Sequence, residues 1–157
     1  MPRCEGVGPA DNGRRAERVP DVAEHPSAVT DTHALVFHAG GRWGKRGSRA
    51  RAHFEACEAR RALTYVPAAV VWECSLLAQA RRIRFGRPVR EFFEDLFSNP
   101  AYQPLDLTCE QVYLADEARP NDDPFDALIC AAARSVGLPV LTRDEAIVRS
   151  GLVKTLW

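Results

Sequence analysis

The 157-residue sequence lacks the features that mark membrane, secreted and fibrous proteins. No run approaches about 18 consecutive apolar residues, which excludes a transmembrane helix. No apolar segment follows the early arginines, so we expect no secretory signal peptide. The chain also has no internal repeat and no long low-complexity tract. With 46% apolar and 27% charged residues, it has the composition of one globular domain.

Cysteine is scarce and follows no pattern. The five cysteines are odd in number and form no C-x-x-C pair. This spacing fits neither a disulfide framework nor a zinc site built from thiolates. Cys74 and Cys130 lie in apolar runs of helical character, where packing accounts for them. We therefore expect a reducing compartment, the cytoplasm.

The net charge is zero, with 21 basic and 21 acidic residues, but the two signs are segregated. From Arg42 to Arg90 there are 12 Lys or Arg against three acids, and from Glu91 to Asp126 there are ten acids against one Arg. This asymmetry suits a protein that brings a phosphate-rich ligand to an acidic, cation-binding centre. Two solvated faces of opposite sign are the alternative explanation.

The first 26 residues differ from the rest of the chain. They contain four Pro and three Gly and almost no bulky apolar side chain. Such a segment buries too little surface to offset the entropy of ordering it, so we expect a flexible tail over 1–26 and a domain over 27–157. A start codon assigned upstream of the true one would give the same composition.

Short strands and helices alternate from Ala28 onward. Apolar and β-branched runs predict strands at 28–30, 63–66, 102–107, 138–142 and 153–156. Helical spacing, caps and breakers predict helices at 32–39, 49–62, 68–83, 91–97, 108–118, 122–136 and 144–149. The alternation predicts an α/β fold in which a parallel sheet is covered by helices on both faces.

Acidic residues occur where these elements join. Asp31 and Asp144 follow predicted strands, and Asp126 lies in the first turn of a predicted helix that leads into a strand. In an open parallel sheet these positions share one edge, where ligands bind. Each acid also has a local explanation, because Asp31, Asp144 and Asp123, which precedes Pro124, are good helix caps.

Glu73 has no such local explanation, since the predicted helix at 68–83 presents it on an apolar face. An ionised carboxylate there needs a cation or several donors. Arg134 or Arg143 could supply that charge, and so could a metal ion. Several carboxylates at one edge repel one another unless a cation is present. An all-oxygen set of ligands favours Mg²⁺ or Mn²⁺ over zinc.

Four motifs carry a resemblance to a known family. They are VTDTHALVF (29–37), the glutamate-containing VVWECSLL (70–77), DPFDALICAAA (123–133) and GLPVLTRDEAI (137–147). In this order and spacing they resemble the PIN domain, and more narrowly the VapC-type toxin ribonucleases of bacterial toxin–antitoxin pairs. The resemblance covers about residues 28–157, which is all of the chain except the tail.

The resemblance implies a PIN-like three-layer α/β/α sandwich with a central, mainly parallel sheet. It also implies a Mg²⁺- or Mn²⁺-dependent endoribonuclease that cleaves single-stranded or loop RNA, such as tRNA, with a metal-activated water. The residues that fall on the family's catalytic and metal-binding acids are Asp31, Glu73, Asp126 and Asp144, with Asp123 and Thr142 as secondary candidates. Two positions depart from the family: Ala127 replaces a frequent Arg, and Phe37 replaces a frequent Trp.

Basic residues next to these motifs are candidates for contacts with RNA phosphates, and one Trp among them is a candidate for stacking on a base. The set is Arg42, Trp43, Lys45, Arg46, Arg81, Arg82 and Arg84. Packing in the core or at a dimer interface explains Trp43 equally well. His33, two residues after Asp31, could reach a substrate, although a place on a helix surface explains it too.

The predicted helices offer more apolar surface than a small domain easily buries, at Trp72, Leu76, Phe92, Phe93 and Phe97. A homodimer, or a groove for a helix of a cognate antitoxin, would cover such a surface. A non-catalytic PIN-like module that binds RNA or protein is the alternative to the nuclease. A missing ligand acid would favour that module, and no acid of the motifs is missing.

Overall fold

A computed structural model describes the structure of residues 25–43 and 47–157. Its strands are β1 (Ser27–Thr30), β2 (Leu63–Pro67), β3 (Tyr102–Leu105), β4 (Val140–Leu141) and β5 (Thr155–Leu156). Its helices are α1 (Thr32–Ala39), α2 (Ser48–Glu58), α3 (Ala68–Gln79), α4 (Val89–Ser98), α5 (Cys109–Glu117), α6 (Pro124–Val136) and α7 (Glu145–Ser150). Within the described ranges no helix is long and apolar enough to cross a membrane.

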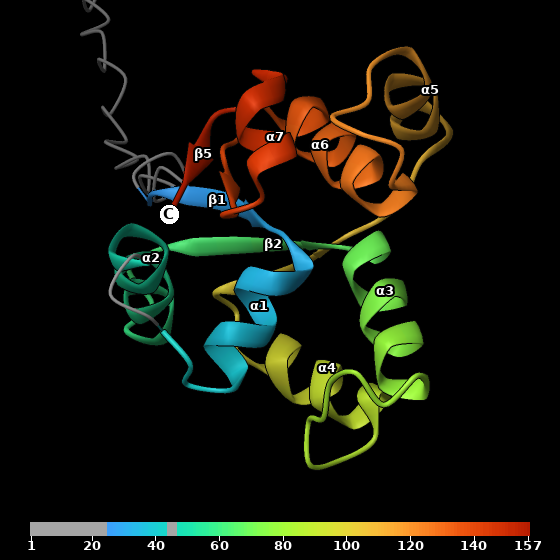
Figure 1. Ribbon diagram of the computed structural model, residues 1–157. Coiled ribbons are helices and arrows are strands. Elements are labelled where there is room, and N and C mark those ends of the chain that lie inside the picture. Colours follow the sequence, from blue (N-terminus) through green and yellow to red (C-terminus); the bar gives the residue numbers. More distant parts are fainter. Residues whose placement is uncertain (1–24, 44–46) are drawn as a thin grey trace, which may run out of the picture.

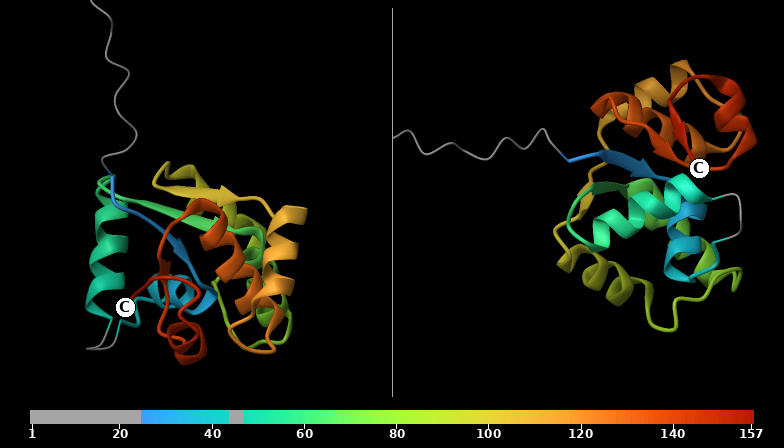
Figure 2. Two further views of the ribbon diagram at one scale, coloured as in Figure 1. Left: turned by 90° about the horizontal axis from the view of Figure 1, so that it is seen from above. Right: turned by 90° about the vertical axis from the view of Figure 1, so that its left-hand side faces the viewer.

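The strands form one sheet in the order β3-β2-β1-β4-β5, and every neighbouring pair is parallel. The chain moves outward from β1 to β3 and then returns to place β4 on the other side of β1. Because crossovers between parallel strands are right-handed, this reversal sends the later helices to the opposite face of the sheet. Helices α1–α4 thus lie on one face and α5–α7 on the other (Figures 1 and 2). The predicted α/β/α sandwich is confirmed.

The first strand lies at the centre of the sheet. Val29 pairs with Tyr65 of β2 on one side and with Val140 of β4 on the other. Its neighbour Ala28 and the following Thr30 are fully buried, as is Val29 itself. Burial on both faces explains why this strand is a continuous run of small and β-branched residues.

Several elements end earlier than the sequence predicts. Helix α2 stops at Glu58 rather than 62, and α3 stops at Gln79 rather than 83. Arg60 and Arg81 follow these ends with φ of 56°, a left-handed conformation that no α-helix continues. Arg81 and Arg82 therefore belong to a turn after α3 and not to the helix itself.

The apolar surface that the sequence predicts is partly covered. Phe92 and Phe93 of α4 are buried, and Phe92 stacks on Phe85 with ring centroids 4.1 Å apart. The expectation that these two rings lie on an open surface is wrong, because α4 turns them into the core. Trp72 and Leu76 of α3 remain 57% and 36% exposed.

Trp43 packs against other aromatic rings. Its ring centroid lies 5.6 Å from that of Phe54 and 5.7 Å from that of Trp157. Packing, one of its two explanations, therefore accounts for its position. Lys45 and Arg46, and residues 1–24 of the predicted tail, lie outside the described residues.

Ala127 stands where members of the family often have Arg. It lies in the contact between α5 and α6. It is buried and packs with Ala115 and Ala131. Three small side chains let the two helices approach closely. The departure is therefore explained by helix packing, because this interface leaves no room for a long charged side chain.

We expect Ala127→Arg to destabilise the protein by at least about 2 kcal/mol, through overpacking and the burial of an unpaired charge. Thermal unfolding followed by circular dichroism measures this loss. Ala52→Arg, at an exposed position of α2, is the matched control and leaves the unfolding temperature nearly unchanged. Equal stability of the two variants would contradict the packing explanation.

Candidate active site

The candidate site lies where the chain reverses its direction across the sheet. Strands β1 and β4 are neighbours, and the chain leaves them toward opposite faces. The carboxyl ends of two such strands form the crevice in which open α/β sheets bind ligands. Asp31 follows β1 and Asp144 comes shortly after β4. The starts of α3 and α6 meet beside this crevice (Figure 1) and bring Glu73 and Asp126.

Asp31 is the most buried acid of the site, with 3% of its surface exposed. Its Oδ1 accepts a hydrogen bond of 2.7 Å from the backbone N–H of Ala34, so the predicted cap of α1 is confirmed. Its Oδ2 accepts a hydrogen bond from the Thr142 hydroxyl. Burial raises the pKa of Asp31 to about 6, although these two hydrogen bonds lower it, and the nearby charge of Asp126 adds to the rise.

Glu73 is half-buried on α3, and its Oε2 accepts a hydrogen bond from the buried hydroxyl of Thr32. Burial is the main cause of its raised pKa. The negative charges of Asp123 and Asp126 raise it further, while the Thr32 hydrogen bond lowers it.

The arginines proposed as partners of Glu73 are elsewhere. Arg134 donates to the carbonyl of Leu114, and the guanidinium of Arg143 lies over the ring of Phe37. Of the two explanations for Glu73, the one that relies on a salt bridge from either arginine is therefore wrong. The donor that holds Glu73 is the neutral hydroxyl of Thr32, and Glu73 forms no salt bridge within the described ranges.

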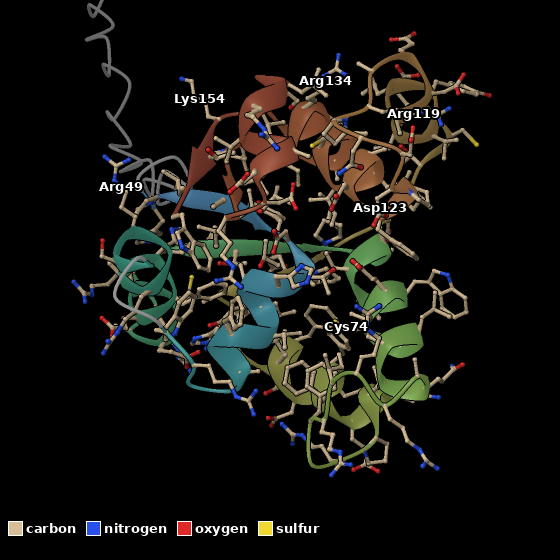
Figure 3. The ribbon with its side chains drawn as sticks, viewed as in Figure 1. Arg49, Cys74, Arg119, Asp123, Arg134 and Lys154 are labelled. Carbon is tan, nitrogen blue, oxygen red and sulfur yellow. The ribbon has the colours of Figure 1, made fainter. Side chains whose placement is uncertain are left out.

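Asp126 is half-buried in the first turn of α6 and accepts a hydrogen bond of 2.8 Å from the side-chain amide of Asn121. The capping role falls to Asp123, which accepts from the N–H of Phe125. Burial raises the pKa of Asp126, and repulsion from Asp144 and Asp123 raises it further. Asp123 is exposed at the start of α6 and is labelled in Figure 3.

Asp144 caps α7, as predicted, with its Oδ1 accepting from the N–H groups of Ala146 and Ile147 at 2.8 and 3.0 Å. Its own N–H donates to the hydroxyl oxygen of Thr142 at 2.9 Å. Thr142 thus contacts Asp31 with its hydrogen and Asp144 with its oxygen. This secondary candidate fixes the relative positions of two acids.

The carboxylates of the site have no ion-pair partner in the part of the chain that the structure describes. Among the described residues, none of the salt bridges involves Asp31, Glu73, Asp126 or Asp144. Because each raised pKa includes repulsion from another acid, the negative charge of the site is only partly compensated.

The donor atoms fit a hard divalent cation. Glu73 Oε1, Asp126 Oδ1 and Asp144 Oδ2 accept no hydrogen bond from the described part of the chain. Oxygen ligands of this kind suit Mg²⁺ or Mn²⁺. In the described ranges no three His, Cys, Asp or Glu side chains already converge in ligating geometry. Binding would therefore draw the free oxygens together.

His33 stands on the wall of this site. It is exposed and lines a cavity of about 430 Å³ together with Asp31 and Asp144. Its positive charge, when protonated, lowers the pKa of Asp31, Glu73 and Asp126. His33 thus faces the carboxylates as well as lying on the surface of its helix.

Sequence reasoning missed two supporting side chains, Thr32 and Asn121. Thr32 directly follows Asp31, and Asn121 precedes the Asp122-Asp123 pair by one residue. Both residue types are frequent near helix starts, so nothing local marks them as partners of acids in other elements.

The raised pKa of Asp31 predicts a pH-dependent stability. The folded value of about 6 exceeds the ordinary 3.8, so folding disfavours ionisation, and stability falls as the pH rises from about 4 through 6. We expect Asp31→Asn to stabilise the metal-free protein at pH 8 by on the order of 1–3 kcal/mol and to flatten this dependence. Urea unfolding in EDTA between pH 4 and 8 measures both effects.

The control is Asp106→Asn, at an exposed position outside the cluster, which should leave the pH dependence unchanged. If Asp31→Asn were less stable than the wild type at pH 8, the buried charge of Asp31 would not destabilise the folded protein, and the prediction would be wrong.

Comparison with solved structures finds the same fold in bacterial toxin–antitoxin proteins. VapBC2 from Rickettsia felis, bound to a DNA fragment of its promoter, matches with a TM-score of 0.60 and 12% identity over 82% of this chain and 96% of that chain. VapC20 from Mycobacterium tuberculosis, a sarcin–ricin loop cleaving toxin, matches with a TM-score of 0.59 and 15% identity over 81% of this chain and 97% of that chain.

FitAcB from Neisseria gonorrhoeae matches with a TM-score of 0.54 and 19% identity over 83% of this chain and 96% of that chain. None of the curated proteins matches this sequence. The sequence model of the PIN domain matches residues 28–151, a span that includes all four acids of the site. This match, which extends over more than half of the sequence, shows that the chain belongs to the PIN domain family.

Proposed function

We propose that this PIN domain is a Mg²⁺- or Mn²⁺-dependent endoribonuclease that hydrolyses phosphodiester bonds of single-stranded or loop RNA, such as tRNA. The observation that carries the proposal is the set of carboxylates around Asp31, which raise one another's pKa and have no cation partner among the described residues. Such a site gains free energy when a divalent cation enters.

Asp31 and Asp126 are the proposed principal ligands, and Glu73 and Asp144 contribute their free oxygens. A bound divalent cation supplies a lower pKa for the attacking water and positive charge beside the phosphate. The protein's own part is to hold the acids in place. Thr142 fixes Asp31, and Thr32 fixes Glu73.

Arginines at the far end of α1 are proposed to bind the RNA backbone. A cavity of about 350 Å³ is lined by the exposed side chains of Arg42, Arg81, Arg82 and Arg84. Helix α1 runs from Asp31 to this cavity, and its eight residues span about 12 Å. A single strand held by the arginines could therefore reach the acids. Lys45 and Arg46, which lie outside the described residues, and Trp43 remain proposed RNA contacts.

The similar structures support a role as the toxin of a toxin–antitoxin pair. VapC20 is a toxin that cleaves the sarcin–ricin loop, and VapBC2 pairs a toxin with its antitoxin. We propose a cognate antitoxin as the partner of this chain, and the cytoplasm as its compartment. The four described cysteines are free thiols, and three of them are buried, which suits a reducing compartment.

RNA cleavage tests the proposed activity. The full-length protein, incubated with tRNA and structured RNA, should cut in Mg²⁺ or Mn²⁺ and stop cutting in EDTA. Asp31→Asn should lower the rate by about 100-fold or more, because it removes a charged ligand. Asp106→Asn, outside the site, should cut like the wild type. Gel electrophoresis of end-labelled RNA gives the rate and the cleavage positions.

A folded protein that binds RNA but leaves it intact in both metals would overturn the nuclease. That result would favour the alternative, a non-catalytic PIN-like module that binds RNA or protein.

We propose a homodimer through the exposed apolar face of α3. Trp72 and Leu76 lie one turn apart on this helix, and Trp72 also borders an apolar cavity of about 250 Å³. Light scattering should give twice the mass of the chain, and Trp72→Glu should shift the protein to the monomer, since it places a charge in the interface. A wild-type protein that scatters as a monomer would overturn this assembly.

A further inference from the structure

Arg143 holds a positive charge beside the acidic site without neutralising it. It lies between Thr142 and Asp144, and its side chain is exposed. Its guanidinium carbon is 4.5 Å from the ring centroid of Phe37 and 5.9 Å from that of Trp157. Stacking on two aromatic rings therefore fixes its position.

The polar edge of this guanidinium is available to a ligand. Among the described residues, Arg143 makes neither a salt bridge nor a side-chain hydrogen bond. A planar guanidinium held by its faces presents its N–H groups at the rim, in the geometry that a phosphate accepts.

Two cavities meet at Arg143. The first, of about 430 Å³, contains the acids Asp31 and Asp144. The second, also of about 430 Å³, is mostly apolar and is lined by Val148 and Trp157. Arg143 and Arg149 border both cavities. Arg149 donates its Nε–H to the carbonyl of Glu145 at 3.2 Å, and its Nη2 lies 3.5 Å from the Glu145 carboxylate in an exposed ion pair. Its Nη1 has no partner among the described residues.

The Phe37 ring on which Arg143 stacks also borders the arginine-lined cavity at the far end of α1. Phe37 lines the cavity of Arg42, Arg81, Arg82 and Arg84 as well as supporting Arg143. Arg143 thus lies between those arginines and the acids.

We propose that Arg143, Arg149, Val148 and Trp157 form a nucleotide subsite for the RNA residue next to the cleaved phosphate. Its base enters the apolar cavity beside Trp157 and Val148, and its phosphate binds Arg143 and Arg149. Base–aromatic contact accepts any base, so this subsite positions the strand and does not read its sequence. The inference rests on the proposed ribonuclease function and extends it.

Binding of a fluorescein-labelled single-stranded 12-nucleotide RNA tests the subsite. Anisotropy is measured in Mg²⁺ with the full chain carrying Asp31→Asn, so that the RNA stays intact. Arg143→Gln should weaken binding about tenfold and lower the slope of log affinity against log salt by about 0.7, the loss of one phosphate contact on a single strand. Arg49→Gln removes an exposed arginine of α2 that borders none of these cavities (Figure 3) and should stay within about twofold.

The cavity itself is tested by Val148→Asp, which places a negative charge where the base should enter. Val148 is 50% exposed, so the variant should fold, and Val136→Asp at 38% exposure is the matched control. Val148→Asp should weaken binding about tenfold, and Val136→Asp should not. A single abasic position moved along the RNA should weaken binding at one place, and that effect should disappear in Val148→Asp because the base and the cavity form one contact.

Two results would overturn the subsite. If Arg143→Gln and Val148→Asp bind like their controls while the wild-type protein cuts RNA, the subsite is wrong and the nuclease stands. If the wild-type protein neither binds nor cuts RNA, both proposals fail together.

Discussion

The buried negative charge of Asp31 is the constraint on which the site depends. Desolvation makes this charge costly, and its pKa rises to about 6 despite hydrogen bonds from Ala34 and Thr142. Asp31 is buried because it connects the central strand β1 to helix α1. Its side chain could reach solvent only if β1 and α1 were both disrupted. The remaining acids repel the Asp31 carboxylate, which raises the free energy of its ionised form further. A divalent cation at the site would offset the negative charge of all these carboxylates.

Neutral hydrogen-bond donors hold the acids in place and leave their negative charge uncompensated. Thr142 and Thr32 fix the carboxylates of Asp31 and Glu73 through hydroxyl groups, which orient an oxygen without cancelling its charge. An arginine in either place would offset the negative charge and would occupy the position of a cation. Arg143, which lines the cavity of Asp31 and Asp144, is instead held against aromatic rings.

Local signals predicted the elements and the caps, and they missed the contacts between elements. Asp31, Asp123 and Asp144 cap helices because a short acid before a helix satisfies the first N–H groups whatever the rest of the chain does. The convergence of the acids followed from a rule about parallel sheets. The pairing of Thr32 with Glu73, 41 residues away, and the stacking of Arg143 on Phe37 depend on how the layers pack. No local pattern encodes them.

The segregation of charge along the sequence has a counterpart in space. In the basic stretch Arg42–Arg90, most of the described arginines lie in α2 and in the turns that follow α2 and α3, two helices on one face of the sheet. The acidic stretch continues through α5 to the start of α6 on the other face. Helix α4 is the exception, and its Asp95 and Glu94 pair with the nearby Arg87 and Arg90. The uncompensated acids therefore gather where the layers meet. In the proposed function, an RNA strand bound by these arginines would come to that boundary with part of its charge offset, so its phosphates could approach carboxylates that would otherwise repel them.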